Sequence, residues 1–299
     1  MKLLITGGTV FVSRFAARYF ADRGHEVTVL NRGSRPQERG VRLIQADRHQ
    51  LGDALKGETF DAVLDICAYT AQDVTDLLEA LPPVKDYILI SSSAVYPETL
   101  PQPFSEDQPV GPNRIWGAYG ANKIEAEKAL LAARPDAYIL RPPYLYGPMQ
   151  NLYREPFGFD CARLGRPFYL PEDGMMKLQF FHVEDLCRMM ENLLTIRPDR
   201  RIWNVGNPEC ITVKEFATLC YEAVGTPFRW VQVWDHPSQR DYFSFYPYEY
   251  ALDVTCQQAF LGTVKPLDEG FRESWAWYRE HMEEVRKRDF IGFIDAHLK

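Results

Sequence analysis

Thr6-Gly7-Gly8-Thr9-Val10-Phe11-Val12-Ser13 follows the short apolar run Leu3–Thr6 and leads into a helical pattern from Phe11 to Arg23. A strand that ends in glycines and enters a helix forms a corner where backbone N–H groups and the helix dipole can face a phosphate. Glycines at this corner allow a tight turn and a close approach of the backbone to phosphate. The residues expected to contact a dinucleotide at this turn are Gly7, Thr9, Val10, Phe11 and Val12.

The turn departs from the spacing TGxxGxxG, because Val10 and Ser13 stand where glycines are usual and Gly7 alone matches. Two interpretations stay open. The segment is either an ordinary strand–helix turn, or a dinucleotide site whose affinity is reduced because the Val10 side chain pushes the phosphates outward. Its place at the first strand of the chain favours binding.

Short apolar runs and helical patterns alternate up to residue 145. Strands that are apolar throughout and separated by helices are typical of a parallel sheet buried on both faces. The sequence therefore predicts a Rossmann-type, doubly wound α/β fold. The expected strands are Leu3–Thr6, Val27–Leu30, Leu43–Gln45, Ala62–Ile66, Tyr87–Ile90 and Ala137–Leu140. The expected helices are Phe11–Arg23, Ala71–Ala80 and Gly120–Ala133.

The pattern is less regular after residue 148, where aromatic residues, prolines and longer loops appear. We expect a dinucleotide-binding domain over 1–148, with 180–206 packing back onto it, and a smaller α+β substrate domain over 149–179 and 207–299. The helices expected in this half are Val183–Leu194, Val213–Val224 and Leu267–Arg286, and the loops are Pro167–Gly174 and Trp234–Pro247. The segment from Phe290 to Ile294 is expected to form a terminal helix packed on the body, in preference to a membrane-contacting one.

Composition excludes several classes of protein. With 34 basic and 41 acidic residues the net charge is −7, which disfavours a dedicated nucleic-acid binder. The six cysteines form no CxxC pair, which indicates free thiols in a reducing compartment and neither a zinc site nor a disulfide framework. No apolar run is long enough to span a membrane, and we expect a cytoplasmic protein without a metal site.

The end of the second expected strand, Leu30-Asn31-Arg32-Gly33, bears on the choice of cofactor. An acidic residue there would bind the ribose 2′-hydroxyl of NAD. Asn31 carries no charge to repel a 2′-phosphate, and Arg32 or Arg35 could pair with one, unless these arginines are solvated loop charges. The sequence therefore predicts a preference for NADP over NAD.

A phenol and an ammonium, those of Tyr119 and Lys123, lie four residues apart on one face of an expected helix. Before them, the buried strand in Ile88–Tyr96 runs into three serines at the sheet edge where α/β proteins bind ligands. An ammonium beside a phenol favours the phenolate, which can exchange a proton with an alcohol while a nicotinamide exchanges the hydride. A serine hydroxyl within reach orients the substrate oxygen.

With these motifs, the chain resembles the extended short-chain dehydrogenases/reductases of the NAD-dependent epimerase/dehydratase family. The runs Leu140–Pro148, Phe181–Leu186 and Trp203–Gly206 match further signatures of that family over nearly the whole chain. The resemblance implies a homodimer formed through the Tyr-Lys helix and its neighbour. It also implies catalytic roles for Ser92, Tyr119 as acid/base and Lys123, which also contacts ribose; cofactor contacts from Asp47, Arg48 and Pro142; and substrate contacts from Ser93, Tyr144 and Arg240.

Departures from the family pattern narrow the expected activity. Ser93-Ala94 stands where the sugar dehydratases of the family carry Asp-Glu, so dehydration is disfavoured. Leu178 replaces an arginine that often binds a diphosphate, which leaves Arg240 as either an anion contact or a solvated loop residue. We expect a reductase or 4-epimerase for a sugar-like substrate, with a nucleotide sugar as the leading candidate.

An alternative function comes from the turn itself, since Gly7–Val12 also resembles the GGTxFIG turn of chloroplast stem-loop RNA-binding relatives. That alternative is a non-catalytic protein that binds a dinucleotide or RNA. Two other residues are left with open roles. His182 is expected to cap or pack the following helix, and Asp65 either faces the cofactor or caps the next helix.

Overall fold

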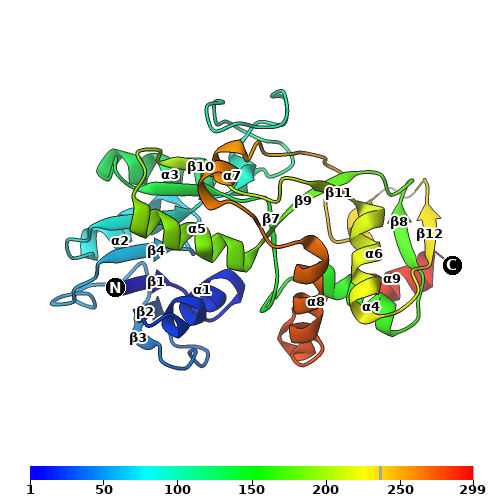
Figure 1. Cartoon of the computed structure of the whole chain (residues 1–299), viewed down its shortest axis with the longest axis horizontal. Helices are drawn as coiled ribbons and strands as arrows, with labels where there is room; N and C mark the ends of the chain where they lie inside the picture. The colour runs from blue at the N-terminus through cyan, green and yellow to red at the C-terminus, as the bar shows by residue number, and fades with distance from the viewer. Residues whose placement is uncertain (236–237, 299) are drawn as a thin grey trace.

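The computed structural model describes residues 1–235 and 238–298. Within these residues, parallel strands form one central sheet (Figure 1). Its strands, in spatial order, are β10 (Ile202–Asn204), β6 (Tyr138–Arg141), β5 (Asp86–Ile90), β4 (Ala62–Asp65), β1 (Lys2–Thr6), β2 (Glu26–Asn31) and β3 (Arg42–Gln45). All six pairings are parallel, which confirms the predicted Rossmann-type sheet.

Helices cover both faces of this sheet. On one face, α1 (Phe11–Asp22) and α5 (Val183–Ile196) pack with strand residues such as Leu3 and Ile5. On the other, α2 (Ala71–Ala80) and α3 (Ala118–Ala133) pack with the alternate residues, such as Leu4. Successive side chains of a strand point to opposite faces, so strands that are apolar at every position need a helical layer on each side.

The strand order places β1 between β2 and β4, so the chain reverses its direction of winding next to β1. In open α/β sheets, ligands bind outside the carboxyl ends of the strands at such a switch point. The carboxyl end of β1 is the glycine turn, and that of β4 leads into Cys67, Ala68 and Tyr69. The topology therefore places the expected cofactor turn at the ligand-binding edge of the sheet.

Most of the remaining elements, which Figure 1 shows beside the central sheet, surround a second core rich in aromatic residues. The exception is α7 (Thr255–Leu261), whose apolar residues pack in the core of the central sheet. Two small sheets belong to the second core, with strand orders β11-β9-β7 and β12-β8. Its strands are β7 (Tyr144–Tyr146), β8 (Phe168–Pro171), β9 (Lys177–His182), β11 (Cys210–Thr212) and β12 (Trp230–Val233). The other helices are α4 (Glu155–Arg163), α6 (Val213–Val224), α7 (Thr255–Leu261), α8 (Leu267–Tyr278) and α9 (Phe290–His297), with 3₁₀ turns η1 (Ser93–Val95), η2 (Gln239–Asp241) and η3 (Met282–Glu284).

This arrangement of cores supports the division into two domains, which we keep as a proposal. α5 packs in the sheet core and β10 extends the central sheet, although both follow the first residues of the second core in sequence. We therefore propose 1–148 with 180–206 as one domain and 149–179 with 207–299 as the other.

The structure corrects two of the predicted elements. The helix expected to reach Arg286 ends at Tyr278. There Nδ1 of His281 forms a hydrogen bond of 2.8 Å with the Trp277 carbonyl, and the chain continues in a 3₁₀ turn. The expected loop Pro167–Gly174 contains β8, whose partner β12 is remote in sequence. The loop expected over Trp234–Pro247 includes residues 236–237, which lie outside the described residues.

The chain end packs as predicted, because α9 buries Phe290 and Ile294 against the second core. Among the described helices, none has the length and apolar character needed to cross a membrane.

A buried carboxyl group in the first turn of α4 should make folding depend on pH. Glu155 is 1% exposed, and burial raises its pKa to about 7. Because the pKa is raised in the folded protein, the contribution of this group to the free energy of unfolding is fully present at low pH, where the group is protonated. That contribution is lost as the pH rises through about 7. We expect Glu155→Gln to be more stable than the wild type at alkaline pH, with an advantage that grows by about 2 kcal/mol between about pH 5.5 and about pH 8.5.

Urea unfolding of both proteins at the two pH values measures this difference, with Glu283→Gln, at an exposed position, as the control. An advantage of Glu155→Gln that does not change with pH would show that the carboxyl group stays ionised in the folded protein.

Candidate functional site

The two glycines after β1 have a backbone that other residues adopt with strain, with φ of 93° at Gly7 and 95° at Gly8. A Cβ atom at Gly7 would lie 2.6 Å from Sγ of Cys67, and one at Gly8 would lie 2.5 Å from Cγ1 of Val29. The turn is therefore tight in both backbone angle and space, as a phosphate-binding corner requires.

Val10 and Ser13, which replace the usual glycines, contact other protein groups at the turn. Val10 begins α1 without a side-chain cap, so the first N–H groups of the helix are free of side-chain acceptors there. Ser13 is buried and donates its hydroxyl proton to the Val10 carbonyl at 3.0 Å. Val10, Val12 and Phe11 pack in a cluster with Met149, Val183 and Trp277. Thr9, between them, is half-buried.

Asn31, at the end of the neighbouring strand β2, forms hydrogen bonds that hold the glycine turn in place. Its amide nitrogen donates to the Gly7 carbonyl at 2.6 Å, and its oxygen accepts from the Gly33 N–H at 2.8 Å. Arg32 and Arg35 follow in an exposed loop, and neither guanidinium has a carboxylate partner among the described residues. Two uncompensated positive charges therefore stand beside the position expected for the adenosine ribose.

Asp47 and Arg48 lie after β3 and differ in their surroundings. Asp47 is exposed and accepts from the His49 N–H at 3.0 Å. Arg48 turns inward instead, and donates to Asp65 at 2.6 Å and to the Asp73 carbonyl at 2.8 Å. The Arg48 side chain is thus committed to holding its loop against β4 and α2, and its expected contact with a cofactor stays a prediction from the resemblance.

Asp65 takes neither of the roles expected for it. It is fully buried and accepts hydrogen bonds from Thr6 at 2.7 Å and from Tyr87 at 2.6 Å as well as from Arg48. The cap of α2 is Thr70, in a capping box with Asp73. Asp65 therefore links β1, β4 and β5 below the ligand edge.

A buried polar network fixes α3 on the sheet. Glu127 accepts from Arg141 at 2.6 Å and from Ser91 at 2.5 Å. Arg141 also donates to the Tyr96 hydroxyl at 2.9 Å, which in turn donates to Asn204 at 2.8 Å. The network joins α3 to β5, β6 and β10, so the residues one and two turns earlier on α3 have a defined position at the sheet edge.

Gly120 allows α3 to lie against the serine turn, because a Cβ atom there would come 2.4 Å from the Ala94 carbonyl oxygen. On either side of this contact stand the expected catalytic residues. Tyr119 is 42% exposed, and Ser92 is half-buried and caps η1. The phenol is therefore not walled off by the protein.

Lys123 is 2% exposed, and its ammonium donates to the carbonyls of Ala68 at 2.7 Å and Ile90 at 2.9 Å. An ammonium has three donors. These two bonds leave one donor, near the carboxyl ends of β4 and β5, without a hydrogen-bond acceptor among the described residues.

Other expected residues line the same side of the sheet. The Pro142 carbonyl accepts from the Ser93 N–H at 2.9 Å, and the Ser93 hydroxyl donates to Tyr250 at 3.1 Å. Tyr144 is buried, its ring lies 5.9 Å from that of Tyr250, and its hydroxyl has no partner among the described residues. Ser93 thus reaches from the serine turn to the second core, where Tyr144 of β7 is also buried.

Tyr69 was not among the residues predicted for the site, and it lies beside Lys123. Its ring is 54% exposed and lies 4.9 Å from Nζ of Lys123. Its place just beyond the carboxyl end of β4 was the available signal, because that edge binds ligands in this fold.

A positively charged cavity of about 260 Å³, which the sequence did not predict, lies at the edge of the second core. Arg240, which was expected to bind substrate, lines it together with Trp116, Tyr144, Tyr153, Tyr246, Arg154, Arg286 and Arg288. Burial lowers the pKa of Arg240, and the charges of Arg288 and Arg154 add to this effect. No ion pair joins any of these four arginines to a carboxylate in the described part of the chain.

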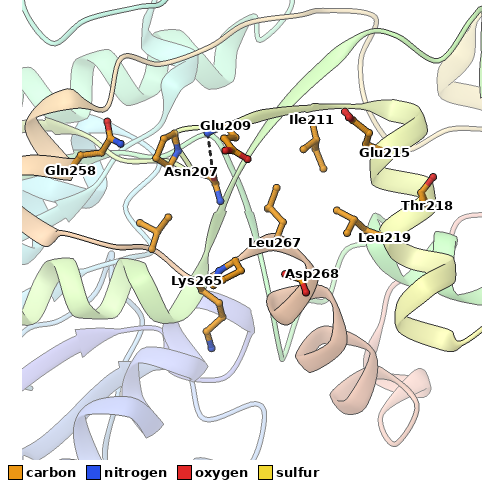
Figure 2. A pocket seen from close by; sticks show the side chains of 13 residues that line it. Asn207, Glu209, Ile211, Glu215, Thr218, Leu219, Gln258, Lys265, Leu267 and Asp268 are labelled. Atoms are coloured by element: carbon orange, nitrogen blue, oxygen red, sulfur yellow. Dashed lines mark hydrogen bonds between the residues drawn. The ribbon is translucent and has the colours of Figure 1, made fainter.

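A larger groove of about 720 Å³ lies elsewhere, between α6 and α8 (Figure 2). It is lined by residues such as Ile211, Glu215, Leu219 and Asp268, and by none of the expected site residues. Its size alone therefore does not mark it as the site of the predicted chemistry.

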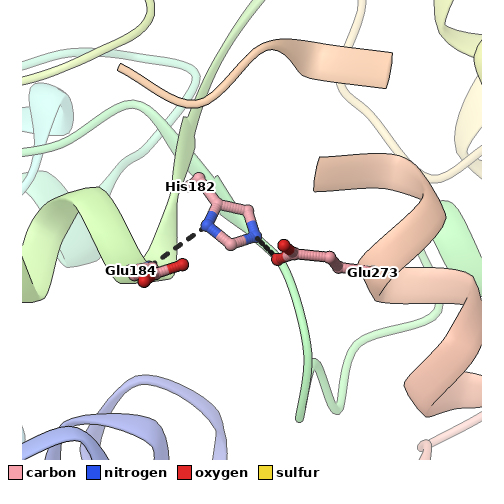
Figure 3. A group of neighbouring side chains, drawn as sticks. All are labelled: His182, Glu184 and Glu273. Atoms are coloured by element: carbon pink, nitrogen blue, oxygen red, sulfur yellow. Dashed lines mark hydrogen bonds and ion pairs between the residues drawn. The ribbon is translucent and has the colours of Figure 1, made fainter. Parts of the chain in front are cut away.

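His182, Glu184 and Glu273 converge at the start of α5 (Figure 3). Nδ1 of His182 accepts from the Glu184 N–H at 3.3 Å, so the proton is on Nε2, and burial lowers the pKa of the ring to about 3. The cation between the carboxylates is Lys265, which donates to Glu184 at 2.5 Å and to Glu273 at 2.6 Å. His182 thus caps α5, as expected, within an ion-paired link to α8.

Comparison with known proteins identifies the family of the chain. Residues 3–206 match the model of the NAD dependent epimerase/dehydratase family. The chain is 31% identical over 245 residues to the chloroplast stem-loop binding protein of 41 kDa b from Arabidopsis thaliana, which covers 76% of the chain and 64% of that relative. It is 28% identical to the probable GDP-L-fucose synthase 1 of Oryza sativa subsp. japonica, over 80% of the chain and 76% of the relative.

Solved structures share the fold. MoeE5 in complex with UDP-glucose and NAD superposes with a TM-score of 0.74 at 23% identity, covering 94% of this chain and 100% of that one. Epimerase Mth375 from Methanothermobacter thermautotrophicus gives a TM-score of 0.78 at 20% identity, covering 95% and 94%. With more than half of its length matched, the chain belongs to the NAD dependent epimerase/dehydratase family.

Proposed function

We propose that the protein is an NAD(P)-dependent oxidoreductase that acts on a secondary alcohol or ketone of a nucleotide sugar, as a reductase or a 4-epimerase. The observation that carries the proposal is the buried Lys123 ammonium, held by two carbonyls at the ligand edge of the sheet, one helical turn from the exposed phenol of Tyr119.

The β1–α1 corner fits a dinucleotide, because its two glycines keep the turn tight and the start of α1 has no side-chain cap. Gly7, Thr9, Val10, Phe11 and Val12 would hold the pyrophosphate there. The free donor of Lys123 would bind the nicotinamide ribose. When bound, the nicotinamide supplies the hydride acceptor or donor.

The protein's own groups then handle the proton. Tyr119 Oη accepts the proton of the substrate hydroxyl during oxidation and returns it to the oxygen during reduction. Ser92 donates its hydroxyl proton to the same substrate oxygen and orients it. Ser93 and Ala94 offer no carboxyl group for an elimination, so dehydration is not part of the proposal.

The arginine-lined cavity supports an anionic substrate. Four guanidiniums line this cavity without a carboxylate partner among the described residues, so the cavity is a local positive site in a chain of net charge −7 and favours an anion. Aromatic rings stand beside two of them, with Arg154 4.9 Å from the Tyr144 ring and Arg240 4.4 Å from the Tyr246 ring. A diphosphate joined to an aromatic base matches both features.

This assignment is tested by titrating UDP-glucose, GDP-fucose and dTDP-glucose into the protein. We expect at least one to bind, and Arg154→Ala with Arg240→Ala to raise its Kd by about tenfold or more, because each change removes a charge-assisted contact. Arg272→Ala, at an exposed arginine paired with Asp268, is the control. Binding that the double variant does not weaken would contradict the assignment.

We further propose that the cofactor is NADP, because Arg32 and Arg35 are exposed, have no carboxylate partner among the described residues, and follow a strand that ends without a carboxylate. NADPH is expected to bind the wild type about tenfold more tightly than NADH, and Arg32→Ala with Arg35→Ala to remove most of the difference. Fluorescence titration measures both affinities. Arg39→Ala, in the same exposed loop, should change neither, and a wild type that prefers NADH would refute the proposal.

A homodimer formed through α3 and the neighbouring α2 is proposed from the family resemblance. α2 and α3 pack side by side on one face of the sheet, which makes a surface of two helices available for this contact.

A second candidate function is RNA binding without turnover, because one relative at 31% identity is named a stem-loop binding protein. The match spans less than two thirds of that relative, and the acidic balance opposes it. Filter binding of a structured RNA with a steep salt dependence would favour this candidate. If such RNA binding is absent and hydride transfer is measured, the oxidoreductase function is supported.

A further inference from the structure

The strand β12 carries a sequence that is symmetric about its centre. Around Gln232, the segment Arg229-Trp230-Val231-Gln232-Val233-Trp234-Asp235 has valine on each side, then tryptophan, then opposite charges. The outer side chains are unusually exposed for apolar residues, with Trp230 at 45%, Val231 at 39% and Trp234 at 56%. Exposed apolar patches of this kind mark interaction surfaces.

One edge of β12 is open. The strand pairs in parallel with β8, and no other described strand pairs with it; Figure 1 shows it at the outer margin of the molecule. Arg229 and Val233 accept from β8 through their carbonyls, at 2.8 and 2.9 Å. Backbone groups of successive residues point to opposite sides, so Trp230, Gln232 and Trp234 direct theirs to the open edge.

Open edges of natural sheets are usually blunted by charges, prolines or bulges. From Trp230 to Trp234 this edge has none of these, and its charges stand only at the two ends. The strand thus lacks the features that prevent pairing with another chain.

We propose that two copies of this chain pair through β12, antiparallel about a twofold axis at Gln232, to form a continuous sheet β8-β12-β12-β8. In this register Gln232 lies opposite Gln232 of the second copy, and Trp230 lies opposite Trp234 of the second copy. These are the residues whose backbone groups face the open edge. Valines 231 and 233 face each other on the other side. The pairing spans Trp230 to Trp234, because the backbone leaves the extended conformation at Asp235, where φ is 59°.

This surface is separate from the α2–α3 surface, because β12 belongs to the second core and α2 and α3 cover the central sheet. The inference does not depend on the proposed enzymatic function. A chain that uses both surfaces would assemble beyond a dimer.

Disulfide trapping tests the register directly. Residues opposite each other in a hydrogen-bonded antiparallel pair have Cα atoms about 5.5 Å apart, a separation that a disulfide spans. Gln232→Cys should therefore form a covalent dimer under mild oxidation. Ile196→Cys, at a position 61% exposed at the end of α5, should not, and the wild type shows the background from the six native cysteines. Equal crosslinking of the two variants would overturn the proposal.

Sedimentation velocity gives the second test. Trp230→Lys with Trp234→Lys should halve the mass of the assembly, while Ile196→Lys leaves it unchanged; an unchanged mass for the double variant would overturn the proposal.

Discussion

Tyr119→Phe is expected to lower kcat by about 10²–10⁴-fold with little effect on cofactor affinity, because general acid–base catalysis contributes about that much. The change removes one hydroxyl oxygen and keeps a ring that is 42% exposed, so folding should be unaffected. Steady-state turnover with the sugar nucleotide that binds most tightly, combined with NADPH titration of the same variant, measures the two effects separately.

Tyr69→Phe is the matched control, since the Tyr69 ring stands 4.9 Å from the same ammonium and is also exposed. We expect it to keep most of the turnover. If Tyr69→Phe abolished turnover and Tyr119→Phe did not, the acid/base role would belong to the other phenol and the proposed site geometry would be wrong.

Arg141→Met is expected to lower the free energy of unfolding by about 3–5 kcal/mol, because it leaves the buried Glu127 carboxylate without its counter-ion. Both side chains are almost fully buried, and the two groups share hydrogen bonds of 2.6 and 3.0 Å. Since the network also holds Ser91 and Tyr96, its loss should release α3 from the sheet. Urea unfolding followed by circular dichroism gives the change.

Arg134→Met serves as the comparison, because Arg134 pairs with Asp136 near the surface at 2.8 Å. Surface pairs contribute about 0–1 kcal/mol, so this variant should stay close to the wild type. A loss for Arg141→Met as small as that for Arg134→Met would mean that the buried pair does not anchor α3.

The sequence predicts the fold well because its signals are local. The helices Ala71–Ala80 and Val213–Val224 have the predicted bounds, and each begins at a capping box that opens an apolar periodic run. The end of α8 at Tyr278 and the strand β8 depend instead on a side-chain bond of His281 and on a partner strand remote in sequence. Such tertiary contacts leave no local pattern.

Only the part of the candidate site that lies close together in the sequence could be predicted. Tyr119 and Lys123 lie one turn apart on a single helix, so spacing alone finds them. Arg154, Arg240 and Arg288 reach their cavity from three separate segments, and no spacing rule connects them. The inward turn of Arg48 toward Asp65 depends on the fold of its loop, which the sequence does not show.

A crystal structure of the protein with NADPH would show whether the proposed site binds the cofactor. We expect the pyrophosphate at the Gly7–Val12 turn, a ribose hydroxyl within about 3 Å of Lys123 Nζ, and the nicotinamide ring beside Tyr119 Oη. A dinucleotide bound away from this edge, or a complex in which the ring cannot reach that phenol, would contradict the proposed site.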